Sequence, residues 1–150
     1  KTPNPALQKT INLSVVGLIF AAGLFKVYLT SSPQMITSLQ LKSYPTAAIG
    51  WIQEHRPAGQ MLNSYNWGGY LVWNLRSYPV FVDGRTDLYG DEIFGEYRQI
   101  ILGKPGWQQL MEKWNIHLVL LEPDQPVVGM LAQNGWTLLY QDAIAVVYGR

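Results

Sequence analysis

One segment of the chain packs aromatic residues, glycines and acid–base pairs more densely than any other part. Its two pieces read Tyr65-Asn66-Trp67-Gly68-Gly69-Tyr70-Leu71-Val72-Trp73 and Val80-Phe81-Val82-Asp83-Gly84-Arg85-Thr86-Asp87-Leu88-Tyr89. The first piece predicts a glycine-bearing loop that opens a helix, because Leu71, Val72 and Leu75 follow helical spacing. The second piece predicts a short buried strand over 79–82 that ends in a charged turn. We therefore expect this segment to be either a structural corner or a ligand site.

The residues around this segment predict an α/β domain over 44–150. Helical apolar spacing or helix-start signals mark 44–56, 91–102, 107–114 and the residues after Asp124. Apolar or alternating runs predict strands over 60–64, 117–121, 136–140 and 144–148, the last two as an antiparallel hairpin. The resulting order is α-β-α-β-α-α-β-α-β-β. That order predicts a small mixed sheet with helices packed on it.

The N-terminal part predicts one transmembrane helix over 11–30. Residues 1–10 are polar and contain Pro3 and Pro5, which indicates a loop-like cytoplasmic flank, and 31–43 forms a juxtamembrane connector. At ~1.5 Å per residue, the apolar stretch 11–29 extends ~28 Å, about one hydrocarbon core. Two alternatives remain: a signal peptide cleaved near Ala21-Ala22-Gly23, or a buried helix of a soluble protein.

Composition supports a membrane location. Charged residues make up 14% of the 150 residues, against about 25% in typical soluble domains. The net charge of +1 without a Lys/Arg cluster gives no reason to expect nucleic acid as a partner. The chain has no cysteine, which excludes disulfides, a thiol nucleophile and cysteine-ligated zinc. It begins with Lys1 rather than Met, so we expect a fragment or a processed product.

The flanking charges suggest an orientation. Lys1 and Lys9 precede the apolar stretch, and Lys42 is the nearest cation beyond Lys26. This bias predicts a single-pass protein of the cell (inner) membrane with its C-terminal domain extracytoplasmic. Gly17 and Ala21 form a small-xxx-small pair, which suits contact with a helix of another membrane subunit. The expected partners are therefore membrane lipid and other membrane subunits.

Three acidic residues recur every fourth position at the end of the predicted strand. Asp83, Asp87 and Asp91 supply oxygen ligands that could hold Ca²⁺ or Mg²⁺. The alternative is structural: Asp83 pairs with Arg85, Asp87 caps a turn, and Asp91 caps the next helix. We favour the structural interpretation, and expect no metal or other cofactor.

The aromatic residues of the first piece allow a second kind of site. The rings of residues 65, 67, 70 and 73 could form a platform for a sugar ring or a lipid headgroup, hydrogen-bonded by Asn66 and Arg85. The alternative is packing around a glycine corner. An anion at a helix opened by two glycines is a weaker option, since no lysine accompanies them. The ligand-binding candidates are Tyr65, Asn66, Trp67, Gly68, Gly69, Asp83, Arg85 and Asp87.

No residue pattern predicts catalysis. His55 and His117 lack metal-ligand spacing, and Ser64 and Ser77 lack a nucleophile context. An independent hydrolase therefore has almost no support, and we expect no catalytic residue in this chain.

The two quoted pieces, with Gly106-Trp107 and Gly135-Trp136, resemble a known family. They are similar to the C-terminal extracytoplasmic domain, with its last membrane helix, of multi-pass bacterial membrane proteins. Those proteins resemble glycosyltransferases that use lipid-linked sugars, of the protein mannosyltransferase type. The resemblance covers about residues 11–150. In that superfamily the catalytic acids lie in an early loop between the first membrane helices, which this chain lacks, so the resemblance implies no catalytic residue here.

Two functions follow as expectations. The first is a non-catalytic, membrane-anchored accessory or assembly subunit of a larger complex, such as a respiratory or photosynthetic one. The second is the sugar- or acceptor-binding domain of a lipid-linked-sugar glycosyltransferase.

Overall fold

The computed structural model describes residues 4–31, 35–37 and 43–150, and these fall into two units. One unit is Lys1–Leu41 and the other is Lys42–Arg150. Most of the predicted connector 31–43, and the first three residues of the predicted flank 1–10, lie outside the described residues.

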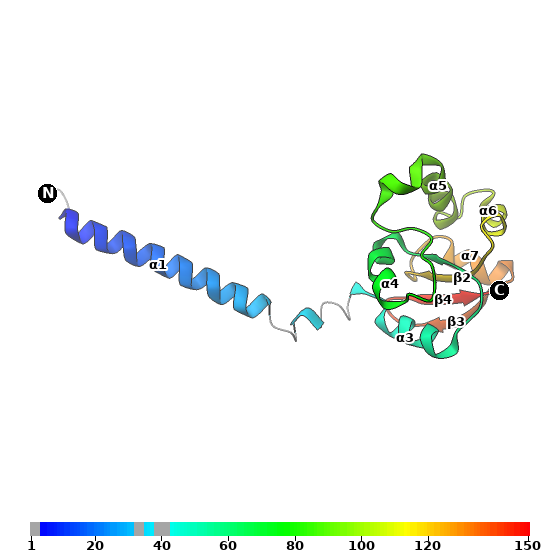
Figure 1. The fold of residues 1–150 in the computed structure, drawn as a ribbon, viewed down its shortest axis with the longest axis horizontal. Helices are drawn as coiled ribbons and strands as arrows, with labels where there is room; N and C mark the ends of the chain where they lie inside the picture. The colour runs from blue at the N-terminus through cyan, green and yellow to red at the C-terminus, as the bar shows by residue number, and fades with distance from the viewer. Residues whose placement is uncertain (1–3, 32–34, 38–42) are drawn as a thin grey trace. The chain divides into compact units, whose positions relative to one another are not determined.

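The first unit is dominated by one long apolar helix, α1, over Pro5–Thr30 (Figure 1). Pro5 occupies the start of the helix, where its missing N–H is not needed, and Asn4 accepts a hydrogen bond from Ala6 N at 3.1 Å. The predicted loop therefore stops at Asn4, and residues 5–10 are helical. Within the described residues, α1 is the one helix long and apolar enough to cross a membrane. Its large apolar side chains are exposed; Leu13 is 73% exposed.

The second unit contains a mixed four-stranded sheet in the order β1-β2-β4-β3. The strands are β1 Gln60–Asn63, β2 Ile116–Leu121, β3 Thr137–Gln141 and β4 Val146–Gly149. β1 and β2 are parallel, whereas β4 is antiparallel to both β2 and β3. The predicted α/β class, the mixed sheet and the C-terminal hairpin are confirmed.

Helices cover both faces of this sheet (Figure 1). Alternate residues of β2 point to opposite faces. Leu118 and Leu120 pack with α3 (Thr46–His55) and α4 (Gly68–Asn74), while Val119 and Leu121 pack with α5 (Thr86–Ile101), α6 (Trp107–Lys113) and α7 (Val128–Leu131). The strand is buried from both sides, which explains why its sequence is continuously apolar. Short 3-10 turns, Tyr65–Trp67 and Ala132–Asn134, precede α4 and β3.

The prediction of a strand over 79–82 is wrong. These residues form an irregular segment beside β1, although Val82 is fully buried. Pro79 has no N–H to give a strand ladder, and the side chain of Asn63 binds the backbone of this segment instead. The helix predicted over 91–102 begins earlier, at Thr86, and is interrupted at Gly90, which has φ 65° and ψ 170°.

Candidate functional site

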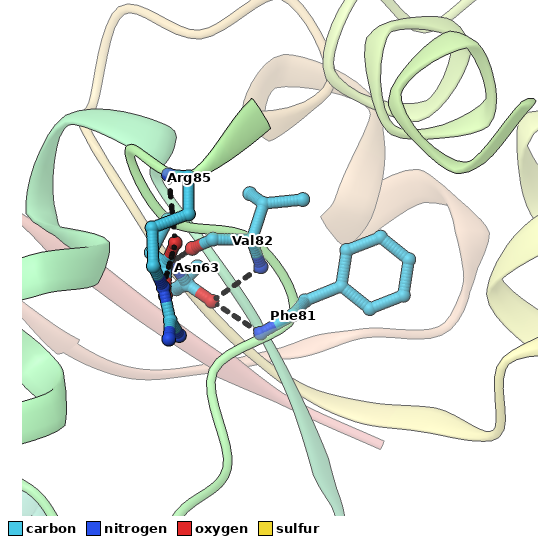
Figure 2. Close-up of polar contacts among 5 residues, drawn as sticks. Asn63, Phe81, Val82 and Arg85 are labelled. Carbon is cyan, nitrogen blue, oxygen red and sulfur yellow. Dashed lines mark hydrogen bonds and ion pairs between the residues drawn. The ribbon is translucent and has the colours of Figure 1, made fainter. Parts of the chain in front are cut away.

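The predicted structural corner exists, and Asn63 at the end of β1 holds it together. Its Oδ1 accepts a hydrogen bond from Phe81 N at 2.7 Å and lies 3.5 Å from Val82 N. Its Nδ2 donates to Val82 O at 2.8 Å and to Ser64 O at 2.9 Å. Figure 2 shows the amide facing the backbone of the 81–82 segment. One buried side chain therefore substitutes for the missing strand ladder.

Gly68 completes the corner because nothing larger fits there. A Cβ at this position would lie 2.4 Å from Val82 O and 2.5 Å from Asp83 Cα. By contrast, a Cβ added at Gly69 would have no neighbouring atom within 4 Å. The two adjacent glycines thus have different roles: the first allows α4 to touch the 82–83 backbone, and the second does not contribute to that contact.

Asp83 and Arg85 form an ion pair, as the structural interpretation of the sequence predicted. Arg85 Nη2 lies 2.6 Å from Asp83 Oδ2, and Arg85 Nε lies 3.1 Å from each carboxylate oxygen. The backbone N of Arg85 donates to Asp83 Oδ1 at 2.9 Å. Hydrogen bonds from Arg85 lower the pKa of Asp83 to about 2, although burial of this carboxyl opposes the shift. The carboxylate is therefore occupied within the corner.

The three aspartates do not gather into a metal site. Asp87 and Asp91 are exposed, whereas Asp83 is 3% exposed and bound to Arg85. Among the described residues, no three His, Asp or Glu side chains lie close enough together to hold a metal ion.

The predicted aromatic residues are distributed over different surfaces instead of forming one platform. The ring of Tyr65 packs edge-on against Phe94 on the α5 side, and its backbone N donates to Tyr97 Oη at 2.8 Å. Trp67 and Tyr70 belong to the other face of the sheet. Trp73 is 72% exposed.

A different group of residues lines a cleft of about 610 Å³, which we call the edge cleft. Its walls are Ser43, Tyr44, Asn66, Trp67, Glu122, Pro123, Asp124, Ala143 and Ile144. Residues 66–67 and 122–124 follow the carboxyl ends of the parallel strands β1 and β2, and residues 43–44 precede α3. Residues 143–144 belong to the β3–β4 turn, which meets this edge because Val146 pairs with Leu121. Ligands of α/β proteins commonly bind outside the carboxyl ends of parallel strands. Of the predicted ligand-binding residues, Asn66 and Trp67 line this cleft.

Three hydrogen bonds from other side chains fix the Glu122 carboxylate in the edge cleft. Its Oε1 accepts hydrogen bonds from Ser64 Oγ at 2.6 Å and from Asn66 Nδ2 at 3.3 Å. Its Oε2 accepts from Gln125 Nε2 at 3.3 Å. The carboxylate is thus fixed between the ends of β1 and β2 and lines the cleft.

Sequence reasoning missed Glu122 and Tyr44. Glu122 directly follows the apolar strand β2, and the same rule that singled out Asp83 at a strand end would have found it. Tyr44 had no such signal, because its place in the cleft depends on stacking against Tyr70, with ring centroids 4.3 Å apart.

On the first unit, Gly17 and Ala21 lie one turn apart on α1, and both are exposed. Comparison of the chain with protein-family models, with curated proteins and with solved structures gave no match.

Proposed function

We propose that this chain is a membrane-anchored, non-catalytic extracytoplasmic domain that serves as an accessory or assembly part of a larger membrane complex. The observation that carries this proposal is α1. Its 26 residues include an apolar stretch whose side chains are exposed. Exposing so much apolar surface to water is unfavourable at roughly 25 cal/mol per Å². A lipid bilayer removes that cost.

The extracytoplasmic side follows from the flanking charges. Lys9 lies in the first turns of α1, and Lys26 is close enough to its other end for the ammonium to reach the headgroups. With Lys1 at the N-terminal side and Lys42 as the next cation after Lys26, the cytoplasmic end is the N-terminal one. This arrangement corresponds to a single-pass protein of the cell (inner) membrane.

The non-catalytic part of the proposal rests on how the polar residues are used. Asn63 and Asp83, which are buried, bind the backbone or Arg85 within the corner. Ser64 donates to Glu122 and accepts from Asn66 N, so its hydroxyl closes the 3-10 turn. These contacts stabilise the fold, and because the Ser64 side chain is 2% exposed and also caps the turn, we assign its contact with Glu122 a structural role.

The assembly part is tested by purification from native membranes in mild detergent, followed by mass spectrometry of the intact complex. We expect the chain to migrate with at least one other membrane subunit. Gly17→Leu combined with Ala21→Leu should weaken that association, because the larger side chains keep a partner helix away. Gly23→Leu, on a different face of α1, is the matched control. Migration of the wild-type chain alone, without another subunit, would contradict the assembly proposal.

A second candidate function is recognition of a sugar or acceptor within a lipid-linked-sugar glycosyltransferase. The observation favouring it is that Asn66 and Trp67, both in the segment that carries the family resemblance, line the edge cleft. The mass of the mature protein separates the two candidates. A long multi-pass protein with an acidic first extracytoplasmic loop favours the transferase, and a single-pass protein favours the subunit.

A further inference from the structure

The edge cleft has a negative charge that no described residue on its walls balances. Glu122 and Asp124 are both acidic, and none of the nine lining residues is a lysine, an arginine or a histidine. Asp124 is exposed, whereas Glu122 is half-buried. An anionic ligand would be repelled here, and a cationic ligand would be attracted.

The Glu122 carboxylate is oriented before any ligand arrives. Ser64 Oγ, at 2.6 Å, is the closest of its three donors, and Ser64 itself is 2% exposed. A carboxylate has about four acceptor positions, and three hydrogen bonds occupy part of them, two on Oε1 and one on Oε2. Oε2 therefore keeps the greater free capacity for a donor from outside the chain.

An aromatic ring, that of Tyr44, also lines the cleft. Tyr44 stacks on Tyr70 with an interplanar angle of 18°, so the Tyr44 ring is held in place. Ile144 adds an apolar side chain, and Asp142 fixes its position by accepting hydrogen bonds from Ile144 N and Ala145 N, each at 2.7 Å. A planar cation can meet a carboxylate at its edge and an aromatic or aliphatic surface at its face.

We propose that the edge cleft receives an arginine side chain from a partner protein, with the guanidinium bound to Glu122 and packed against Tyr44. Arginine fits better than lysine because its planar guanidinium packs on a ring while one of its N–H groups donates to Oε2. This inference rests on the proposed function, since it names the contact by which an accessory domain would hold a partner subunit.

The test uses the full chain in lipid nanodiscs and a fluorescent peptide, Gly-Gly-Arg-Gly-Gly, followed by fluorescence anisotropy. The matched control peptide carries citrulline, which has nearly the same shape as arginine but no charge. We expect binding of the arginine peptide that weakens as salt is added, and at least about tenfold weaker binding of the citrulline peptide.

Two variants locate the site. Glu122→Gln keeps the side-chain shape and an acceptor for Ser64, and should weaken binding about tenfold or more. Ala143→Leu fills the cleft from the exposed β3–β4 turn without touching these hydrogen bonds, and should do the same. Glu112→Gln is the matched control, because the Glu112 side chain is 67% exposed and lies outside the cleft, and this variant should bind the peptide like the wild type.

Three results would overturn the inference: equal binding of the two peptides, unchanged binding by both cleft variants, or binding of methyl glycosides at the cleft with none of the arginine peptide. The last result would favour the second candidate function. Resistance of each variant to carbonate extraction is measured in parallel. A chain that carbonate extracts from the membrane would contradict the proposed anchor. A chain that stays in the membrane but does not bind the peptide would contradict the role of the cleft alone.

Discussion

Replacing Asn63 by alanine should destabilise the second unit strongly, because one side chain holds the corner. The substitution removes the partner of Phe81 N, at 2.7 Å, and of Val82 O, at 2.8 Å. Ser64 O loses one donor but keeps the hydrogen bond from Trp67 N at 3.1 Å. The 3.5 Å approach of Val82 N is too long to add much.

The magnitude follows from counting the groups left without a partner. Leaving one buried donor or acceptor unpaired costs about 1–3 kcal/mol. Two such groups, next to Val82 at 0% exposure, give about 2–6 kcal/mol. That is a large share of the roughly 5–15 kcal/mol that stabilises a domain of ordinary size.

The assay is urea unfolding of the detergent-solubilised chain, followed by tryptophan fluorescence. Asn74→Ala is the control, because its side chain bonds only to Tyr70 O within its own exposed helix end. We expect the unfolding midpoint of Asn63→Ala to fall far below that of the control, with an unchanged slope. A difference of less than about 0.5 kcal/mol between the two variants would refute the role given to Asn63.

Three further results are expected from the same unfolding assay. Gly68→Ala should destabilise the domain by at least about 1–3 kcal/mol through its clash with the 82–83 backbone, whereas Gly69→Ala should be neutral or stabilise α4 by up to ~1 kcal/mol; similar midpoints for the two would contradict the close approach. Asp83, whose pKa is lowered from 3.8 to about 2, should contribute stability that is present above about pH 4 and lost as the pH falls through about 2. Asp83→Asn should lower the free energy of unfolding by about 1–2 kcal/mol at pH 7, after allowing for the exposure of its partner Arg85. If the stability of this variant fell as steeply at low pH as that of the wild type, another group would be responsible for the pH dependence. Tyr97→Phe should cost about 1 kcal/mol by removing one hydrogen bond, and a variant as stable as wild type would show that this bond contributes nothing.

Periodicity predicted the layers of the fold but not the shape of its corner. β2 could be found from sequence because burial on both faces requires a continuous apolar run such as Leu118–Leu121. Residues 79–82 have a similarly apolar character, yet they form no strand. Their backbone is bound by a side chain distant in sequence, Asn63, and local pattern carries no information about such a contact.

The candidate site shows the same division. The pairing of Asp83 with Arg85 is local and could be predicted from two residues on the same turn. The edge cleft depends on four chain segments meeting at one end of the sheet, and Glu122 binds Ser64 and Asn66 from the end of the other parallel strand. That meeting requires the strand order β1-β2-β4-β3, which the sequence did not reveal.

The central claim, that α1 spans the membrane with the α/β domain outside, is tested most directly by cysteine accessibility in intact bacterial cells. The native chain has no cysteine, so Lys9→Cys and Gln109→Cys each introduce a single reporter. Gln109 is exposed on α6. We expect a membrane-impermeant maleimide to label Gln109→Cys in intact cells and Lys9→Cys only after permeabilisation. Protection of Gln109→Cys until the cells are opened would contradict the claim.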